Sequence, residues 1–180
     1  MSVTTRRSWI LAGQLILLGA LAAPVHAQSS ASGSIGVTAT LVTPLQLIVS
    51  HPLDFGRLLT SSTKTIAPNS ATSGRFEILG QGGSAISVTL SMPASLSPAG
   101  GGTNLPVSNW MYVASETSSL AGTPVSFTSG TNAPIPFTLE TFNGSVKMYF
   151  ALGATVTAGA LHAAGAYSAT GQITTAYTDL

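Results

Sequence analysis

The stretch that decides the fold is Ile135–Leu152, which reads IPFTLETFNGSVKMYFAL. Apolar and polar residues alternate over Phe137–Glu140, which is the two-residue period of a β-strand with one buried face. Asn143-Gly144 follows, and this dipeptide is preferred in type I′ turns, whose twist matches that of paired strands. The sequence therefore predicts a hairpin that joins a strand over 135–142 to a strand over 145–152.

Similar alternation recurs along the chain, and no segment shows the sustained 3.6-residue period of a helix. Turns rich in Gly, Pro and Asn separate these short runs. Strands are expected over 34–41, 45–49, 53–59, 63–66, 74–79, 85–91, 110–113, 124–127, 135–142, 145–152 and 166–177, with a loop over 93–106. Many short strands without helices predict an all-β fold, in the form of a single antiparallel β-sandwich domain.

The first 27 residues have the layout of a secretory signal peptide. Arg6-Arg7 precedes the apolar run Trp9–Ala22, and Val25-His26-Ala27 is a small-x-small cleavage pattern. Cleavage after Ala27 leaves a mature domain of 153 residues, 28–180. The apolar run is shorter than the roughly 20 residues of a membrane-spanning helix, so we expect export without a retained transmembrane anchor. We expect the mature domain to reach the periplasm, the cell surface or the medium. An uncleaved anchor and twin-arginine export are the alternatives.

Charged side chains make up only 6% of the chain. The expected mature domain has four cations against five carboxylates, a net charge of −1. So few cations cannot neutralise many phosphates, which argues against nucleic-acid binding. The absence of cysteine excludes disulfides, thiolate metal sites and a cysteine nucleophile. A surface of Ser, Thr, Asn, Gln and Gly suits an extracellular fibre, a coat or a glycan-facing module.

Side chains suited to catalysis occur without a convincing partner. His51 lies near Asp54, but a spacing of three places them on opposite faces of a strand, and His162 lies among small residues. Glu77 and Glu140 are the remaining candidates, as a glycosidase pair on outward-facing strand positions. We therefore predict that the chain is not an enzyme and binds no cofactor or metal ion. A secreted hydrolase is the least favoured of the alternative functions.

The first segment of the mature domain has the pattern of an assembly strand. After the small polar residues 28–34, the uncharged stretch 34–42 alternates with period two, its apolar positions being Ile35, Val37, Ala39 and Leu41. Such a strand can pair within its own domain or add to the exposed sheet edge of a neighbour. Uncharged edges are normally avoided because they polymerise, so a chain that keeps one is predicted to self-associate as a structural subunit.

Two short motifs support this hypothesis by resemblance. Val42-Thr43-Pro44-Leu45 followed by Leu53-Asp54-Phe55-Gly56 resembles the opening of a family of secreted bacterial domains of unknown function. The ending, from Gly153-Ala154-Thr155 to Ile173-Thr174-Thr175-Ala176-Tyr177, resembles the close of the same family. Both ends are also similar to spore-coat-U-type domains and archaic chaperone–usher pilins.

That resemblance implies an incomplete immunoglobulin-like sandwich, completed by the N-terminal strand of a neighbour and assembled with a chaperone or usher. The chain lacks the cysteines usual in those pilins. The alternative function is a monomeric secreted adhesin or glycan-binding module. Trp110, Tyr112 and Phe142 would stack on a sugar if they were exposed, but aromatic residues in strands mostly lie in the core.

Overall fold

The computed structural model describes residues 32–142 and 145–179. The predicted signal peptide, its cleavage site at Ala27 and the predicted turn Asn143-Gly144 lie outside the described residues. The chain divides into two units, 1–39 and 40–180. In the first unit, residues 32–39 form no regular element and are exposed. Nowhere in the described ranges is there a helix with the length and hydrophobicity needed to cross a membrane.

The larger of two antiparallel sheets is organised around one long strand. Its members are β1 (Gln46–His51), β2 (Thr63–Ile66), β3 (Gly74–Leu79), β5 (Ser95–Pro98), β6 (Leu105–Ser115), β7 (Val125–Phe127), β10 (Thr141–Phe142), β11 (Ser145–Thr157) and β12 (Tyr167–Ser168). Their order is β1-β3-β11-β6-β5-β12, with β2 and β10 also paired to β11 and β7 paired to β6. The first half of β11 pairs with β3 and the second half with β2.

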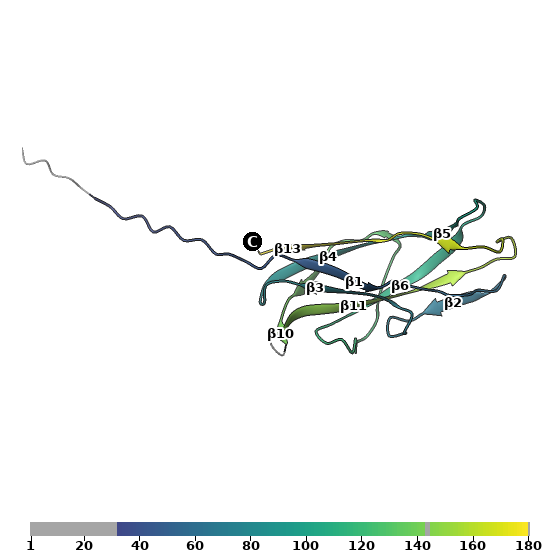
Figure 1. Cartoon of the computed structure of the whole chain (residues 1–180), viewed down its shortest axis with the longest axis horizontal. Coiled ribbons are helices and arrows are strands. Elements are labelled where there is room, and N and C mark those ends of the chain that lie inside the picture. Colours follow the sequence, from purple (N-terminus) through teal and green to yellow (C-terminus); the bar gives the residue numbers. More distant parts are fainter. Residues whose placement is uncertain (1–31, 143–144, 180) are drawn as a thin grey trace, which may run out of the picture. The chain divides into compact units, whose positions relative to one another are not determined.

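The smaller sheet contains β4 (Ala85–Met92), β8 (Gly130–Thr131), β9 (Ile135–Thr138) and β13 (Gln172–Tyr177). Strand β13 pairs with one side of β4, while β8 and β9 share its other side. In Figure 1, β13 and β4 run along the upper layer, and β3 and β11 along the lower one.

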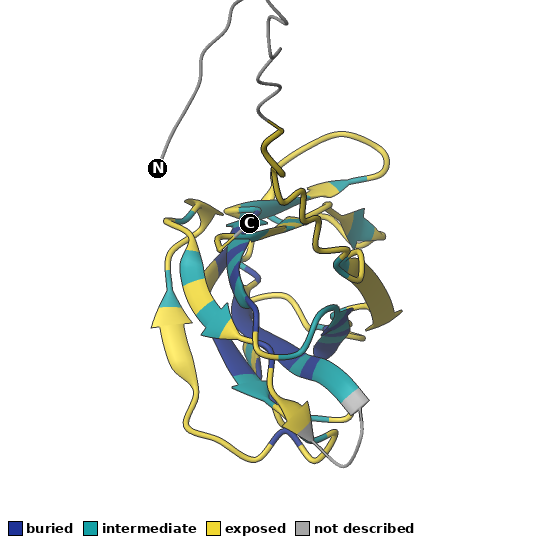
Figure 2. Cartoon of the chain, turned by 90° about the vertical axis from the view of Figure 1, so that its left-hand side faces the viewer, coloured by how far each residue is buried: buried dark blue, intermediate teal, exposed yellow. Residues whose placement is uncertain are grey.

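The two sheets enclose a common core. Phe76 of β3 stacks on Phe150 of β11 at 4.6 Å between ring centroids, and Phe137 of the smaller sheet meets Phe150 edge-on at 5.1 Å. Ile78 in one layer and Ile86 in the other are fully buried. Figure 2 shows buried segments of the sheets toward the interior of the domain, with exposed chain around them. The predicted all-β antiparallel sandwich is confirmed.

The predicted hairpin is formed only next to its turn. Thr141 pairs with Val146 and Phe142 with Ser145, but β9 belongs to the other sheet. The chain changes sheet at Leu139, whose N–H donates to Ser84 O at 3.0 Å and whose carbonyl accepts from Gly83 N–H at 2.7 Å. A continuous strand over 135–142 was therefore a wrong prediction, because burial of Leu139 beside β4 outweighs the local alternation.

Candidate functional site

The strand order leaves one position of an immunoglobulin-like sandwich unfilled. Constant-type domains have strands A-B-E-D in one sheet and C-F-G in the other. Here β1-β3-β11-β6 corresponds to the first sheet and β4-β13 to C-F. In the part of the chain that the structure describes, β13 pairs only with β4 and β1 only with β3, and no strand takes the place of G. Both β1 and β13 therefore have a free edge.

The inner faces of these two edge strands are incompletely covered. Directly opposed residues in an antiparallel pair share one face of the sheet. Val49 of β1 is opposite Phe76, yet Val49 is 62% exposed and Phe76 only 2%. On β13, Ile173 and Tyr177 are half-buried although their partners on β4 are buried. The core therefore lacks a cover between the two free edges.

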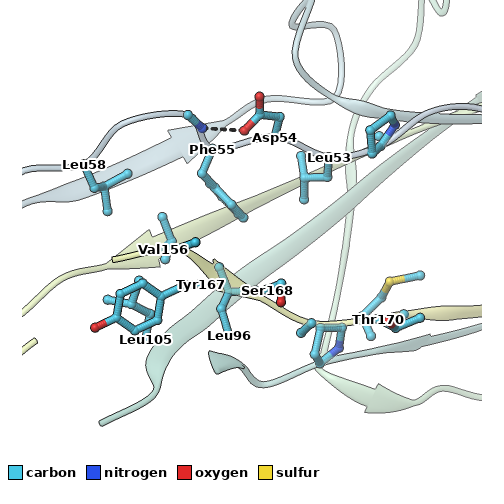
Figure 3. Close-up of a pocket in the computed structure, with 18 of the residues that line it drawn as sticks. Leu53, Asp54, Phe55, Leu58, Leu96, Leu105, Val156, Tyr167, Ser168 and Thr170 are labelled. Carbon is cyan, nitrogen blue, oxygen red and sulfur yellow. Dashed lines mark hydrogen bonds between the residues drawn. The ribbon is translucent and has the colours of Figure 1, made fainter. Parts of the chain in front are cut away.

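A cleft of about 1000 Å³ lies at this opening. Residues 52–59, which follow β1, form one wall, and residues 163–171, which lead into β13, form the other. Figure 3 shows Leu53, Phe55 and Leu58 on one side of the space. The apolar lining consists mainly of Leu53, Phe55, Leu58, Leu96, Leu105, Val156, Tyr167 and Ile173. Apolar side chains of this kind can pack against an apolar surface that enters the cleft.

The motif Leu53-Asp54-Phe55-Gly56 builds one wall of this cleft. Asp54 Oδ1 accepts a hydrogen bond from Gly56 N–H at 2.7 Å, which is an Asx-turn, and Asp54 N–H donates to Thr72 O at 3.0 Å. Gly56 has φ of +61°, a conformation that favours glycine. This turn directs Leu53 and Phe55 inward, and residues 52–59 form no regular element, so the strand predicted over 53–59 is not formed.

The candidate catalytic side chains are engaged in separate contacts. His51 Nδ1 lies 2.8 Å from Pro52 O, and Asp54 Oδ1 accepts from Gly56 N–H. In the described structure no hydrogen bond joins the His51 and Asp54 side chains. Glu77 forms an ion pair with Lys147 of the neighbouring strand at 3.3 Å. Glu140 is exposed. Among the described residues, no group of three His, Asp or Glu side chains is arranged to hold a metal ion.

His162 joins two segments beside the cleft, the turn at Gly159 and the chain at Asn104. Its Nδ1 accepts a hydrogen bond from Gly159 N–H at 2.8 Å, which leaves Nε2 to donate to Asn104 O at 2.9 Å. The Tyr167 hydroxyl donates to Ala163 O at 2.8 Å in the same segment. These contacts position residues 159–167 along the cleft.

The predicted sugar-stacking aromatics lie in the core. Trp110 and Tyr112 are 5% and 8% exposed and pack against Phe127, with ring centroids 6.1 and 6.0 Å away. Trp110 Nε1–H donates to Pro93 O at 3.2 Å, and burial raises the pKa of Tyr112. Both rings therefore lie in the core, as aromatic side chains of strands mostly do, and neither forms an exposed platform for a sugar.

The predicted assembly segment is exposed and unpaired in the isolated chain. Ile35 and Val37 are each 89% exposed and Leu41 is 99% exposed, and Ala39 is exposed as well. Residues 32–45 form no strand, so the strand predicted over 34–42 is not formed here. Period-two alternation indicates which side chains would share one face of a strand. The strand itself also needs the edge of a partner strand for its backbone hydrogen bonds.

Sequence reasoning missed two parts of the cleft. The segment 93–106 was expected to be a loop, yet it contributes β5 and the start of β6, and Leu96 and Leu105 line the cleft. The alternation Ser95-Leu96-Ser97 was the available signal. Tyr167 was expected in one strand with β13, but the chain passes from β12 in the larger sheet to β13 in the smaller one.

Residues 45–177 match the family described as Domain of unknown function (DUF4402), and the chain belongs to that family. The match begins just before β1 and ends with β13, so it includes both free edges. No curated protein matches the chain.

Proposed function

We propose that this chain is an exported structural subunit of a bacterial surface fibre or coat, which assembles by β-strand complementation. The leading segment of one copy, residues 32–42, would fill the cleft between β1 and β13 of the next copy. The observation that carries the proposal is the pair of free strand edges beside an apolar cleft, in a chain that also has an exposed alternating segment.

The chemistry of the segment is complementary to the cleft. Backbone N–H and C=O groups of an inserted strand would pair with β1 and β13, which supplies affinity, and every second side chain would enter the core. Ile35, Val37, Ala39 and Leu41 have that spacing. Full burial of a Val, Ile or Leu side chain contributes about 1.5–3 kcal/mol, so several together can stabilise a contact between copies.

The geometry favours a head-to-tail arrangement. The start of β1 lies beside the end of β13, because the Tyr177 hydroxyl donates to Thr43 O at 2.6 Å. The end of β1 and the start of β13 both line the cleft, so the two strands run antiparallel. A donor antiparallel to β13 would leave the cleft at its far end, near residues 159–167. The acceptor's own segment leaves at the opposite end, at Thr43. Donor and acceptor surfaces at opposite ends form a head-to-tail interface, which generates an open chain of subunits wherever the rotation between copies does not close a ring.

Uncovered edges also account for the expected assembly partner. Free uncharged edges and an open apolar cleft promote uncontrolled aggregation. A chaperone or usher that covers the cleft until exchange with a neighbour would prevent this. The proposal includes no catalytic step, cofactor or nucleic acid, and burial of Trp110 and Tyr112 removes the main support for a glycan-binding module.

The test compares the mature chain 28–180 with a version that lacks residues 28–42. We expect the mature chain to form polymers with increasing concentration, measured by size-exclusion chromatography with light scattering. The shortened chain should stay monomeric and bind a synthetic peptide of residues 32–42, with a rise in melting temperature. A mature chain that stays monomeric at high concentration, with a shortened chain that simply unfolds, would refute strand complementation.

A further inference from the structure

Three residues hold the point at which the leading segment leaves the domain. The Tyr177 hydroxyl donates to Thr43 O at 2.6 Å and accepts from Gln81 N–H at 2.7 Å. Gln81 Oε1 accepts from Thr43 N–H at 3.3 Å and from Thr43 Oγ1 at 3.2 Å. Both backbone polar groups of Thr43 are therefore engaged. We call Thr43, Gln81 and Tyr177 the exit clamp.

The exit clamp rests on closely packed core. Leu45, Leu139 and Tyr177 meet over Gly80, where an added Cβ would lie 2.6 Å from the Tyr177 hydroxyl and 2.8 Å from Leu139 Cδ1 and Leu45 Cδ2. Leu139 is fully buried. The clamp thus connects the start of β1, the turn after β3 and the end of β13 to a part of the domain that cannot shift without a loss of packing.

This arrangement blocks a direct reversal of the leading segment into the chain's own cleft. Reversal at residues 43–45 would need a tight hairpin, and two-residue hairpin turns require positive φ. Pro44 holds φ near −65° and has no N–H, while the backbone groups of Thr43 are already bonded. A reversal nearer the N-terminus would place Ala39 and Leu41 in the turn and remove them from the donor.

We propose that the exit clamp makes a second copy of this chain, and not the chain's own leading segment, the occupant of the cleft. This inference rests on the proposed function. It assigns to Thr43, Gln81 and Tyr177 a positioning role: they suppress self-closure, which would end a growing polymer.

The test uses the mature chain carrying Tyr177→Phe together with Gln81→Ala, with Tyr149→Phe as the control. Tyr177→Phe keeps the ring over Gly80 but removes the bridging hydroxyl, and Tyr149 lies on β11 outside the clamp and the cleft lining. The double variant removes all four hydrogen bonds of the clamp, and a net loss equivalent to only one or two of them already corresponds to a shift of about tenfold. We expect the ratio of monomer to polymer to rise about tenfold in the double variant. Its monomer should not bind the 32–42 peptide, because its own leading segment would fill the cleft. The control should match the wild type.

A second variant leaves the clamp intact, in case the double variant does not fold. Insertion of Asn-Gly between Val42 and Thr43 supplies the missing turn, and we expect it also to yield closed monomers. If the wild type polymerises and both variants polymerise equally well, the exit clamp is refuted while the proposed function stands. If the wild type does not polymerise and the shortened chain binds no peptide, the proposed function itself fails.

Discussion

Substitution of Val37 by arginine should separate assembly from folding. Val37 is 89% exposed in the isolated chain, so Val37→Arg should change the free energy of unfolding of the monomer by no more than about 0.5 kcal/mol. In the assembled state the same side chain would face the cleft between β1 and β13. The substitution should therefore weaken the contact between copies while it leaves the monomer intact.

The size of the effect follows from burial of one valine. Loss of that burial costs about 1.5–3 kcal/mol, and an unpaired guanidinium among apolar side chains costs more. Each 1.4 kcal/mol is about tenfold in affinity, so the dissociation constant should rise by at least about tenfold and by more than about a hundredfold at the upper end.

The assay is fluorescence anisotropy of labelled peptides of residues 32–42, titrated with the chain that lacks 28–42. Thr38→Arg is the matched control, since it adds the same charge at the next position, which points to the opposite face of an inserted strand. Its affinity should stay within about 0.5 kcal/mol of the wild type. Equal effects of Val37→Arg and Thr38→Arg, or no effect of Val37→Arg, would refute the alternating docking of this segment.

Three further predictions concern the fold. Gly153→Ala should lower the free energy of unfolding by about 3 kcal/mol in urea titrations, because an added Cβ would press on Ile66 O and lie 2.8 Å from Pro68 Cδ. The control Gly100→Ala, at a position with open space for a Cβ, should lower it by less than about 1 kcal/mol. Asp54→Ala should cost about 1–2 kcal/mol through loss of the Asx-turn, whereas Asp54→Asn, which keeps an acceptor, should cost less than half as much in the same titration. Because burial raises the pKa of Tyr112, the folded state favours the neutral hydroxyl, so its contribution to stability is present below about pH 10 and is lost as pH rises through the folded-state pKa. Unfolding of Tyr112→Phe, followed by circular dichroism, should depend less on pH above pH 10; an unchanged slope would contradict this.

Local sequence patterns were sufficient to predict those strands that bury one face in the core. The predicted strands over 63–66 and 74–79 coincide with β2 and β3, and the alternation over 85–91 gives β4, in which Ile86, Val88 and Leu90 are buried. The motif Leu53-Asp54-Phe55-Gly56 was recognised from its residues, although its role as a turn was not. Prediction failed where the chain changes sheet, at Leu139 and between β12 and β13, because strand pairing there depends on residues distant in the sequence.

The candidate site could be predicted only in part. Ile35, Val37, Ala39 and Leu41 were identified from spacing alone, because the choice of face depends on neighbours two positions apart. The cleft could not be identified in this way, since its walls, 52–59 and 163–171, are separated by most of the domain.

By itself, the sequence determined the β-strand character, the faces to be buried, the scarcity of charge and the lack of cysteine, all of which depend on composition and short-range periodicity. The tertiary structure alone decided that β1 and β13 are the strands left with free edges. The physical reason is that an edge is free only when every other strand has taken its partner elsewhere, and this is a property of the whole set of pairings.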